Sequence, residues 1–152
     1  MIYVECKPDK ALVMSLGIPK KYIRHVGGKS NICKRLERGY GLKGLMDEDP
    51  LSTQPPYIKS LEVINELSNF KILHDPHRNN YVIMLSPRLE EWILKIAKEV
   101  NINVSNYGLP TNADDLHKVI NVKLENFRKL LSDLRDRSKA IKDLERILKE
   151  RL

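Results

Sequence analysis

Residues 2–49 decide the fold, and they read IYVECKPDKALVMSLGIPKKYIRHVGGKSNICKRLERGYGLKGLMDED. Three short runs in this stretch are expected to form strands, namely residues 2–6, 22–26 and 43–46. A helix is expected in each interval, the first closed by Gly17 and the second capped by Ser30. Strands that alternate with helices imply βαβ units, so we predict an α/β fold with a mostly parallel sheet flanked by helices.

The chain from about residue 57 to residue 110 continues this alternation. A helix is expected from about Tyr57, because apolar residues follow at helical spacing: Ile58, Leu61, Ile64, Leu67 and Phe70. Two strands should come next, at 71–73 and 81–85, joined by a turn at 75–80. A helix is then expected from Ser86-Pro87 to Val100, followed by a short strand at 102–104.

The C-terminal part of the chain has a helical pattern from about Asn112 to the end. Its apolar residues recur at steps of three and four, opposite a charged face; they are Leu124, Phe127, Leu131, Leu134, Ile141, Leu144 and Leu148. We predict a long amphipathic helix in residues 111–152, as an extension to an α/β domain at 1–110. The spacing does not decide whether its apolar face packs on the same chain or on a partner, which would allow a homodimer.

The net charge is confined to one short segment. The 152 residues include 27 Lys and Arg against 20 Asp and Glu, a net charge of +7. Between Lys20 and Lys43 eight bases accompany a single acid, Glu37, and in the rest of the chain the two signs balance. Such a patch predicts contact with the phosphates of DNA or RNA, through Lys20, Lys21, Arg24, Lys29, Lys34, Arg35 and Arg38. The alternative is a solvated surface that serves only solubility.

The sequence also excludes several classes of protein. No apolar stretch approaches the ~20 residues that span a bilayer, and the N-terminal apolar run ends at Glu5, too early for a signal peptide. We therefore expect a cytoplasmic protein without a membrane partner. Cys6 and Cys33 cannot form a disulfide framework, and no Cys or His pair has the spacing of structural zinc.

Acidic residues follow two of the expected strands. Glu5 comes at the end of the first strand, and Asp47 and Asp49 come at the end of the third. The carboxyl ends of parallel strands share one edge of a sheet, where ligands bind in α/β folds. Carboxylates brought together there would repel one another unless a cation neutralised them, and Mg²⁺ (or Mn²⁺) prefers such ligands. The alternative is that Asp47 and Asp49 form a turn and cap the helix after Pro50.

This arrangement resembles the Toprim domain of topoisomerases, primases and OLD-type nucleases. The resemblance covers about residues 1–100 and is carried by Val4-Glu5, Gly27-Gly28-Lys29 and Asp47-Glu48-Asp49, each after a strand. It implies that Glu5 is a general acid/base or a metal ligand, and that Asp47 and Asp49 hold Mg²⁺. Two positions depart from the family pattern: Cys6 stands where Gly usually follows the Glu, and Pro50 follows the acidic pair.

A later segment is similar to an element of the OLD-type branch, in which a second acidic group from a helix helps to bind metal. Its sequence is SPRLEEWIL at residues 86–94. On a helical wheel Glu90 lies at the edge of the apolar face, whereas Glu91 points away and should pair with Lys95. We therefore take Glu90 as a third candidate metal ligand. Its alternative role is to stabilise the N-terminus of its helix.

The GGKS motif at residues 27–30 is not a P-loop, because Ile23 stands where that motif requires Gly. It can still bind phosphate through backbone N–H groups at the start of a helix, with Lys29 supplying positive charge at the catalytic site.

Taken together, these features predict a Mg²⁺-dependent phosphoryl-transfer enzyme acting on nucleic acid, and in particular a nuclease. The alternative is a non-catalytic Toprim-like module that binds nucleic acid or protein.

Overall fold

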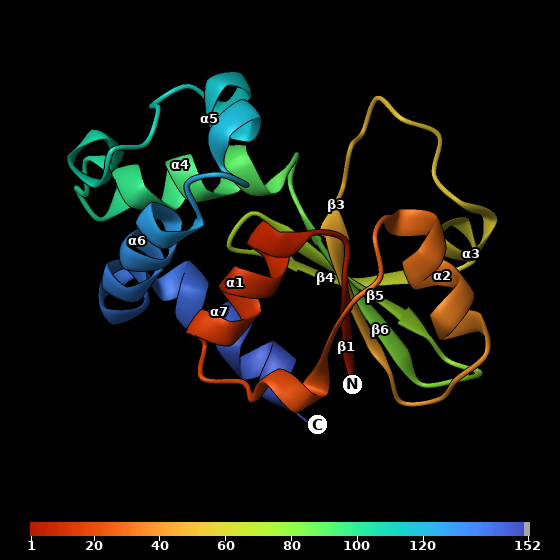
Figure 1. Cartoon of the computed structure of the whole chain (residues 1–152). Helices are drawn as coiled ribbons and strands as arrows, with labels where there is room; N and C mark the ends of the chain where they lie inside the picture. Colours follow the sequence, from red (N-terminus) through yellow and green to blue (C-terminus); the bar gives the residue numbers. More distant parts are fainter. Residues whose placement is uncertain (151–152) are drawn as a thin grey trace.

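The computed structural model describes residues 1–150 and shows an α/β fold in which helices cover both faces of one six-stranded mixed sheet (Figure 1). The strands are β1 (Ile2–Val4), β2 (Ile23–His25), β3 (Lys43–Asp47), β4 (Glu62–Leu67), β5 (Phe70–Asp75) and β6 (Asn80–Leu85). The helices are α1 (Lys7–Ser15), α2 (Lys29–Glu37), α3 (Pro56–Lys59), α4 (Leu89–Glu99), α5 (Ala113–Val119), α6 (Leu124–Arg137) and α7 (Lys139–Lys149). Two 3₁₀ turns, η1 (Lys20–Tyr22) and η2 (Val104–Tyr107), complete the structure.

The sheet is partly parallel, with the strand order β2-β1-β3-β6-β5-β4. The first four strands of this order run parallel, as the alternation of strands and helices predicts. The last two are antiparallel to their neighbours because tight turns connect them. The carboxyl ends of β1, β3 and β6 therefore meet at one edge of the sheet, in register at Val4–Leu45 and Asp47–Leu85.

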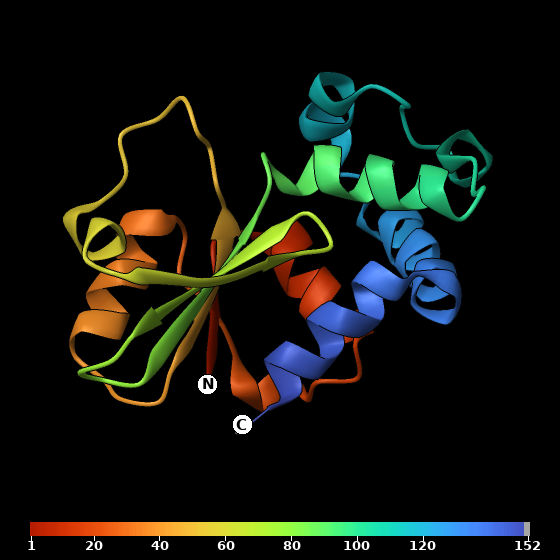
Figure 2. The same ribbon diagram turned by 180° about the vertical axis from the view of Figure 1, so that it is seen from behind.

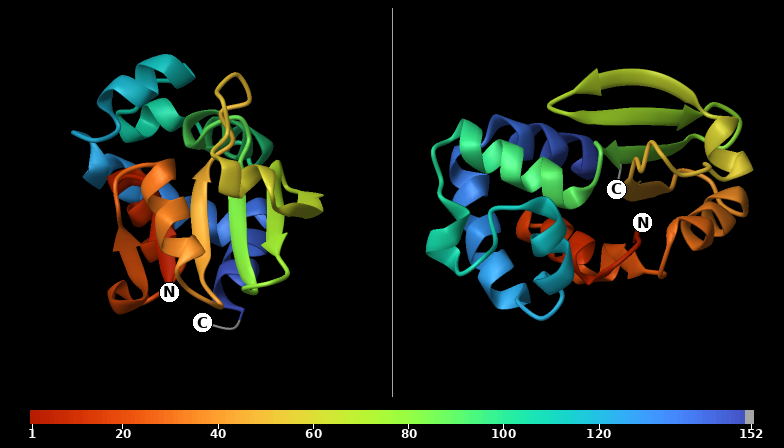
Figure 3. Two further views of the ribbon diagram at one scale, coloured as in Figure 1. Left: turned by 90° about the vertical axis from the view of Figure 1, so that its right-hand side faces the viewer. Right: turned by 90° about the horizontal axis from the view of Figure 1, so that it is seen from above.

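Alternating side chains of the central strands feed two separate cores. Leu45 and Ile83 point into the larger core, which they share with α1, α4, α6 and α7. Met46, Val82 and Met84 point the other way, into a smaller core under α2 and α3. Figures 1 and 3 show the same division, with α2 and α3 on one side of the sheet and the remaining helices on the other. Alternation with period two is what a sheet buried on both faces requires.

The helix expected from about Tyr57 is wrong beyond its first turn. Only the four residues of α3 are helical, and the chain then enters β4, which forms a hairpin with β5. Ser68 and Asn69 connect these strands with φ angles of 47° and 62°, the pair of positive values that a type I′ turn needs. The apolar spacing of three residues favours a helix, but the Ser-Asn turn and the pairing with β5 make this segment an edge strand whose side chains are mostly exposed.

Three further expectations are corrected. The C-terminal region is not one long helix but three, because Asn112 and Ser138 each cap a new helix through a side-chain oxygen. The strand expected at 102–104 is irregular chain that leads into η2. The cap of α2 is Gly28 rather than Ser30, at a φ of 115° that favours glycine.

The C-terminal helices pack on their own chain. Phe127, Leu131, Leu144 and Leu148 are fully buried in the larger core, against the strands of the sheet. At the end of α7 the buried Lys43 of β3 donates from Nζ to the carbonyl oxygens of Ile147 (2.9 Å) and Leu148 (3.0 Å). The start of β1 and the end of α7 thus lie at the same end of the sheet (Figure 2). A homodimer and a division near residue 110 stay predictions.

None of the helices in residues 1–150 combines the length and the apolar character needed to cross a membrane.

Candidate functional site

Two carboxylates lie where adjacent parallel strands end. Glu5 directly follows β1, and Asp47 is the last residue of β3, its neighbour in the sheet. The chain that leaves β6, on the other side of β3, turns through Pro87 into α4 and brings Glu90 to the same edge. A hydrogen bond between a side chain and the backbone fixes this turn, because Asp47 Oδ1 accepts from the Leu89 N–H at 2.8 Å. Asp47 therefore caps α4 in addition to facing Glu5.

A further carboxylate, Asp9, joins this group from the first turn of α1. The sequence predicts only that the segment around Asp9 starts a helix. Its side chain is 1% exposed, and its oxygens accept no hydrogen bond from a nitrogen or oxygen donor; the thiol of Cys6 is the hydrogen-bonding group beside it. The available signal was its spacing, because Asp9 precedes the buried Leu12 and Leu16 by three and seven residues and so falls on the apolar stripe of its helix. We call Glu5, Asp9, Asp47, Asp49 and Glu90 the acidic cluster.

Burial and neighbouring negative charges raise the pKa values of Glu5, Asp9 and Asp47. Burial, reinforced by the negative charge of Asp47, raises the pKa of Glu5 to about 7. Burial likewise raises the pKa of Asp47 to about 7, although its hydrogen bond from Leu89 opposes this, and Glu90 and Asp49 add to the rise. Burial raises the pKa of Asp9 well above its ordinary value, with Asp47 and Glu5 as the next causes. Negative charge at this edge of the sheet is therefore poorly compensated by the protein itself.

The chemistry of these side chains suits a hard divalent cation. All five are carboxylates, the ligands that Mg²⁺ and Mn²⁺ prefer, and Glu5 Oε1, like both oxygens of Asp9, is buried without a nitrogen or oxygen hydrogen-bond donor. Buried polar atoms without partners are uncommon in folded proteins, and an absent ion is one of their ordinary causes. As they stand, however, no three His, Cys, Asp or Glu side chains of residues 1–150 are arranged to hold one ion. Binding would require the carboxylates to rotate toward one another.

One cation of the protein points toward this cluster. Lys29, the first residue of α2, has its Nζ 3.7 Å from Asp49 Oδ2. Its positive charge opposes the rise in the pKa values of Glu5 and Asp47 but does not cancel it. The same Nζ donates to the carbonyl oxygen of Glu48 (3.2 Å) and to Gln54 Oε1 (3.1 Å). Lys29 thus ties the start of α2 to the loop that follows β3.

Glu90 is buried beside a second helix. It is 4% exposed, and its Oε1 lies 3.3 Å from Nδ1 of His117 in α5. The pairing expected for its neighbour is wrong, because Glu91 binds Arg88, whereas Lys95 donates to Asn69. Glu90 therefore belongs to the acidic cluster and Glu91 does not, as the helical wheel predicts.

The predicted nucleic-acid-binding residues fall into two groups. Lys34, Arg35 and Arg38 are exposed on the outer side of α2, the helix that starts at Lys29. Lys20 and Lys21 lie in η1, before β2, and so sit at the amino-terminal end of the sheet, away from Glu5. Arg24 lies between these groups, exposed on the edge strand β2. The residues at the two ends of the basic segment therefore do not form one continuous binding surface.

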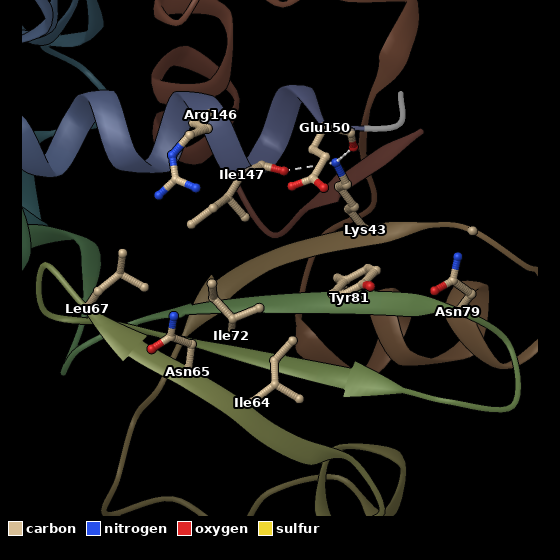
Figure 4. Close-up of a pocket in the computed structure, with 11 residues that line it drawn as sticks. Lys43, Ile64, Asn65, Leu67, Ile72, Asn79, Tyr81, Arg146, Ile147 and Glu150 are labelled. Carbon is tan, nitrogen blue, oxygen red and sulfur yellow. Dashed lines mark hydrogen bonds between the residues drawn. The ribbon is translucent and has the colours of Figure 1, made fainter.

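A separate hollow of about 310 Å³ opens between α7 and the β4–β5–β6 part of the sheet (Figure 4). Its floor is apolar, with Ile64, Leu67, Ile72 and Tyr81, and Arg146 and Ile147 project from α7 above it. The hollow runs along the strands, from Lys43 and Tyr81 at the amino-terminal ends of β3 and β6 to Leu67, which pairs with Phe70 beside the carboxyl end of β6.

Comparison of the chain with models of protein families, with curated proteins and with solved structures finds no match.

Proposed function

We propose that this protein is a divalent-cation-dependent phosphoryl-transfer enzyme that acts on nucleic acid, as a nuclease of Toprim-like architecture. The observation that carries the proposal is the acidic cluster at the carboxyl ends of β1 and β3, where Glu5 and Asp47 have pKa values raised to about 7. Asp9 and Glu5 have buried carboxylate oxygens that accept no hydrogen bond from a nitrogen or oxygen donor, which supports the binding of a cation at the same place. The order of motifs along the parallel strands supports the Toprim-like architecture.

In this proposal Asp47, Asp49 and Glu90 hold Mg²⁺ or Mn²⁺, with Asp9 as an additional ligand. A bound cation would polarise a phosphoryl oxygen and stabilise the charge that develops during cleavage. Glu5, with a pKa near neutrality, can accept or release a proton at physiological pH. Lys29 supplies a positive charge beside Asp49 for a phosphate of the substrate.

The test is cleavage of end-labelled DNA and RNA oligonucleotides with Mg²⁺ or Mn²⁺, comparing the native chain with Asp47→Asn. This substitution removes the charge but keeps an oxygen that can accept the Leu89 N–H, so the cap of α4 is retained. We expect loss of cleavage and weaker Mn²⁺ binding by calorimetry, with an unchanged circular dichroism spectrum. Asp136→Asn, an exposed position on α6, is the matched control. Undiminished cleavage by Asp47→Asn would refute the assignment.

The second candidate is a non-catalytic module that binds nucleic acid through its basic residues. The side-chain arrangement favours it, because no three potential ligands in the described chain stand ready for one ion. Cys6 and Pro50, at the two positions that differ from the Toprim pattern, also favour it. Metal-independent binding without cleavage under any divalent cation would select this candidate.

A further inference from the structure

Tyr40 is an exposed aromatic side chain held on a turn just beyond the end of α2. Its side chain is 71% exposed, far more than packing in a core would leave. Arg78, from the turn between β5 and β6, lies over one face of the ring, with its guanidinium carbon 5.1 Å from the ring centre. The high exposure leaves the ring accessible to a planar partner, and the cation behind it favours stacking of a nucleic-acid base.

The turn that carries Tyr40 is fixed to the sheet on both sides of the ring. Gly41 donates from its N–H to the carbonyl oxygen of Arg78 at 2.9 Å. The buried Asn80 donates to the carbonyl oxygens of Leu36 (2.8 Å) and Gly39 (3.3 Å) and accepts from the Leu42 N–H (2.8 Å). An exposed ring on a turn with this many hydrogen bonds keeps its position without a ligand, so binding would cost little conformational entropy.

The exposed charged side chains between the acidic cluster and Tyr40 are mostly basic. Lys29, at the first residue of α2, faces Asp49, and Tyr40 follows the other end of the same helix. Lys34, Arg35 and Arg38 are exposed on the outer side of the helix beside a single acid, Glu37; we call the three bases the α2 basic face. Nine residues of helix span about 14 Å, roughly four nucleotides at the ~3.4 Å rise of a stacked strand.

We propose that the α2 basic face is a track for a single strand of nucleic acid, and that an unpaired base stacks on Tyr40 at its far end. The inference rests on the proposed function, since α2 begins at Lys29, beside Asp49 of the acidic cluster, and it assigns the substrate class of that site. The α2 basic face binds the phosphates, and Tyr40 with Arg78 binds the base.

A single strand fits these groups better than a duplex. Bases in a duplex are stacked on one another, so their faces are not available to a protein ring, whereas unpaired bases offer a face to any aromatic side chain. The α2 basic face is one protein helix wide, so its Lys and Arg side chains contact the phosphates of one nucleic-acid backbone. Stacking on Tyr40 adds sequence-tolerant affinity to this electrostatic contact.

The experiment measures binding by fluorescence anisotropy in EDTA, so that no cleavage interferes. The probes are a labelled single-stranded oligonucleotide of about 12 nucleotides, which is within the site sizes of known single-strand binders, and a duplex of the same sequence. The full chain is compared with Tyr40→Ala, Tyr40→Trp and the control Val122→Ala, which removes an exposed apolar side chain elsewhere. Circular dichroism checks that each variant folds.

We expect Tyr40→Ala to weaken single-strand binding about tenfold, whereas Tyr40→Trp and Val122→Ala bind as the native chain does. Duplex binding should be weaker than single-strand binding and insensitive to Tyr40→Ala. Native affinity in Tyr40→Ala, an equal loss on duplex and single strand, or no binding by the native chain would each overturn the inference. The proposed function can fail independently of this inference. In that case the binding results would be as expected here, but the native chain would not cleave the oligonucleotides with Mn²⁺.

Discussion

The acidic cluster predicts that the cation-free protein loses stability as the pH rises from 5 to 8. In the unfolded chain Glu5 and Asp47 titrate near their ordinary pKa values of 4.5 and 3.8, whereas in the folded chain both pKa values are raised to about 7. Between these values the folded state holds protons that the unfolded state has released. Stability is therefore greatest below the unfolded pKa values and falls as the pH passes through 7.

The size of the effect follows from Glu5. A pKa raised from 4.5 to about 7 corresponds to about 3 kcal/mol, since a tenfold change in proton affinity is worth about 1.4 kcal/mol. Asp47 has a similar rise, but its charge is one cause of the raised pKa of Glu5, so their contributions do not add. We expect the free energy of unfolding to be about 3 kcal/mol lower at pH 8 than at pH 5.

The assay is urea unfolding followed by circular dichroism, in EDTA, at steps from pH 5 to pH 8. The double variant Glu5→Gln/Asp47→Asn should reduce the pH dependence, because it removes two of the three carboxyls whose pKa is raised and leaves Asp9, while Glu99→Gln/Asp136→Asn at exposed positions should not. Mn²⁺ at a hundred times its dissociation constant should restore about 2.7 kcal/mol at pH 8 to the native chain and not to the double variant. Stability that rises with pH, or an equal slope in the double variant, would refute the reasoning.

Two further predictions concern the basic residues and the buried lysine. Replacing Lys34, Arg35 and Arg38 by Ala should lower the salt dependence of single-strand binding by about 2 in log–log slope, whereas replacing Lys20 and Lys21 by Ala should leave it unchanged, because these lie in η1 and not on α2; titrations at several salt concentrations check this. An equal decrease in both variants would contradict the track along α2. Lys43→Met should lower the free energy of unfolding by about 3 kcal/mol, because the carbonyl oxygens of Ile147 and Leu148 at the end of α7 lose a charged hydrogen-bond donor. Urea unfolding measures this change. A midpoint equal to that of the native chain would show that this contact does not stabilise α7.

Local patterns were reliable where residue type and spacing allow one structure. The β-branched start of the chain, the glycine after α1 and the alternating helices predict the parallel half of the sheet, and the structure confirms it. The pattern after Tyr57 was misleading, because apolar residues at steps of three fit a helix, whereas most side chains of the edge strand β4 are exposed on both faces and show no alternation. The Ser68-Asn69 turn and pairing with β5 decided in favour of a strand, and pairing depends on residues outside the local window.

The sequence by itself determined the α/β class, the order of the first strands and the placement of Glu5, Asp47 and Asp49 after strands. Each of these depends on near neighbours in the chain, through side-chain periodicity, glycine conformation and helix capping. The tertiary structure alone decided that Asp9 faces these acids and that Lys20 and Lys21 do not lie near them. Both depend on which elements pack together, because the environment of a charge is set by residues that are close in space and not by those close in sequence.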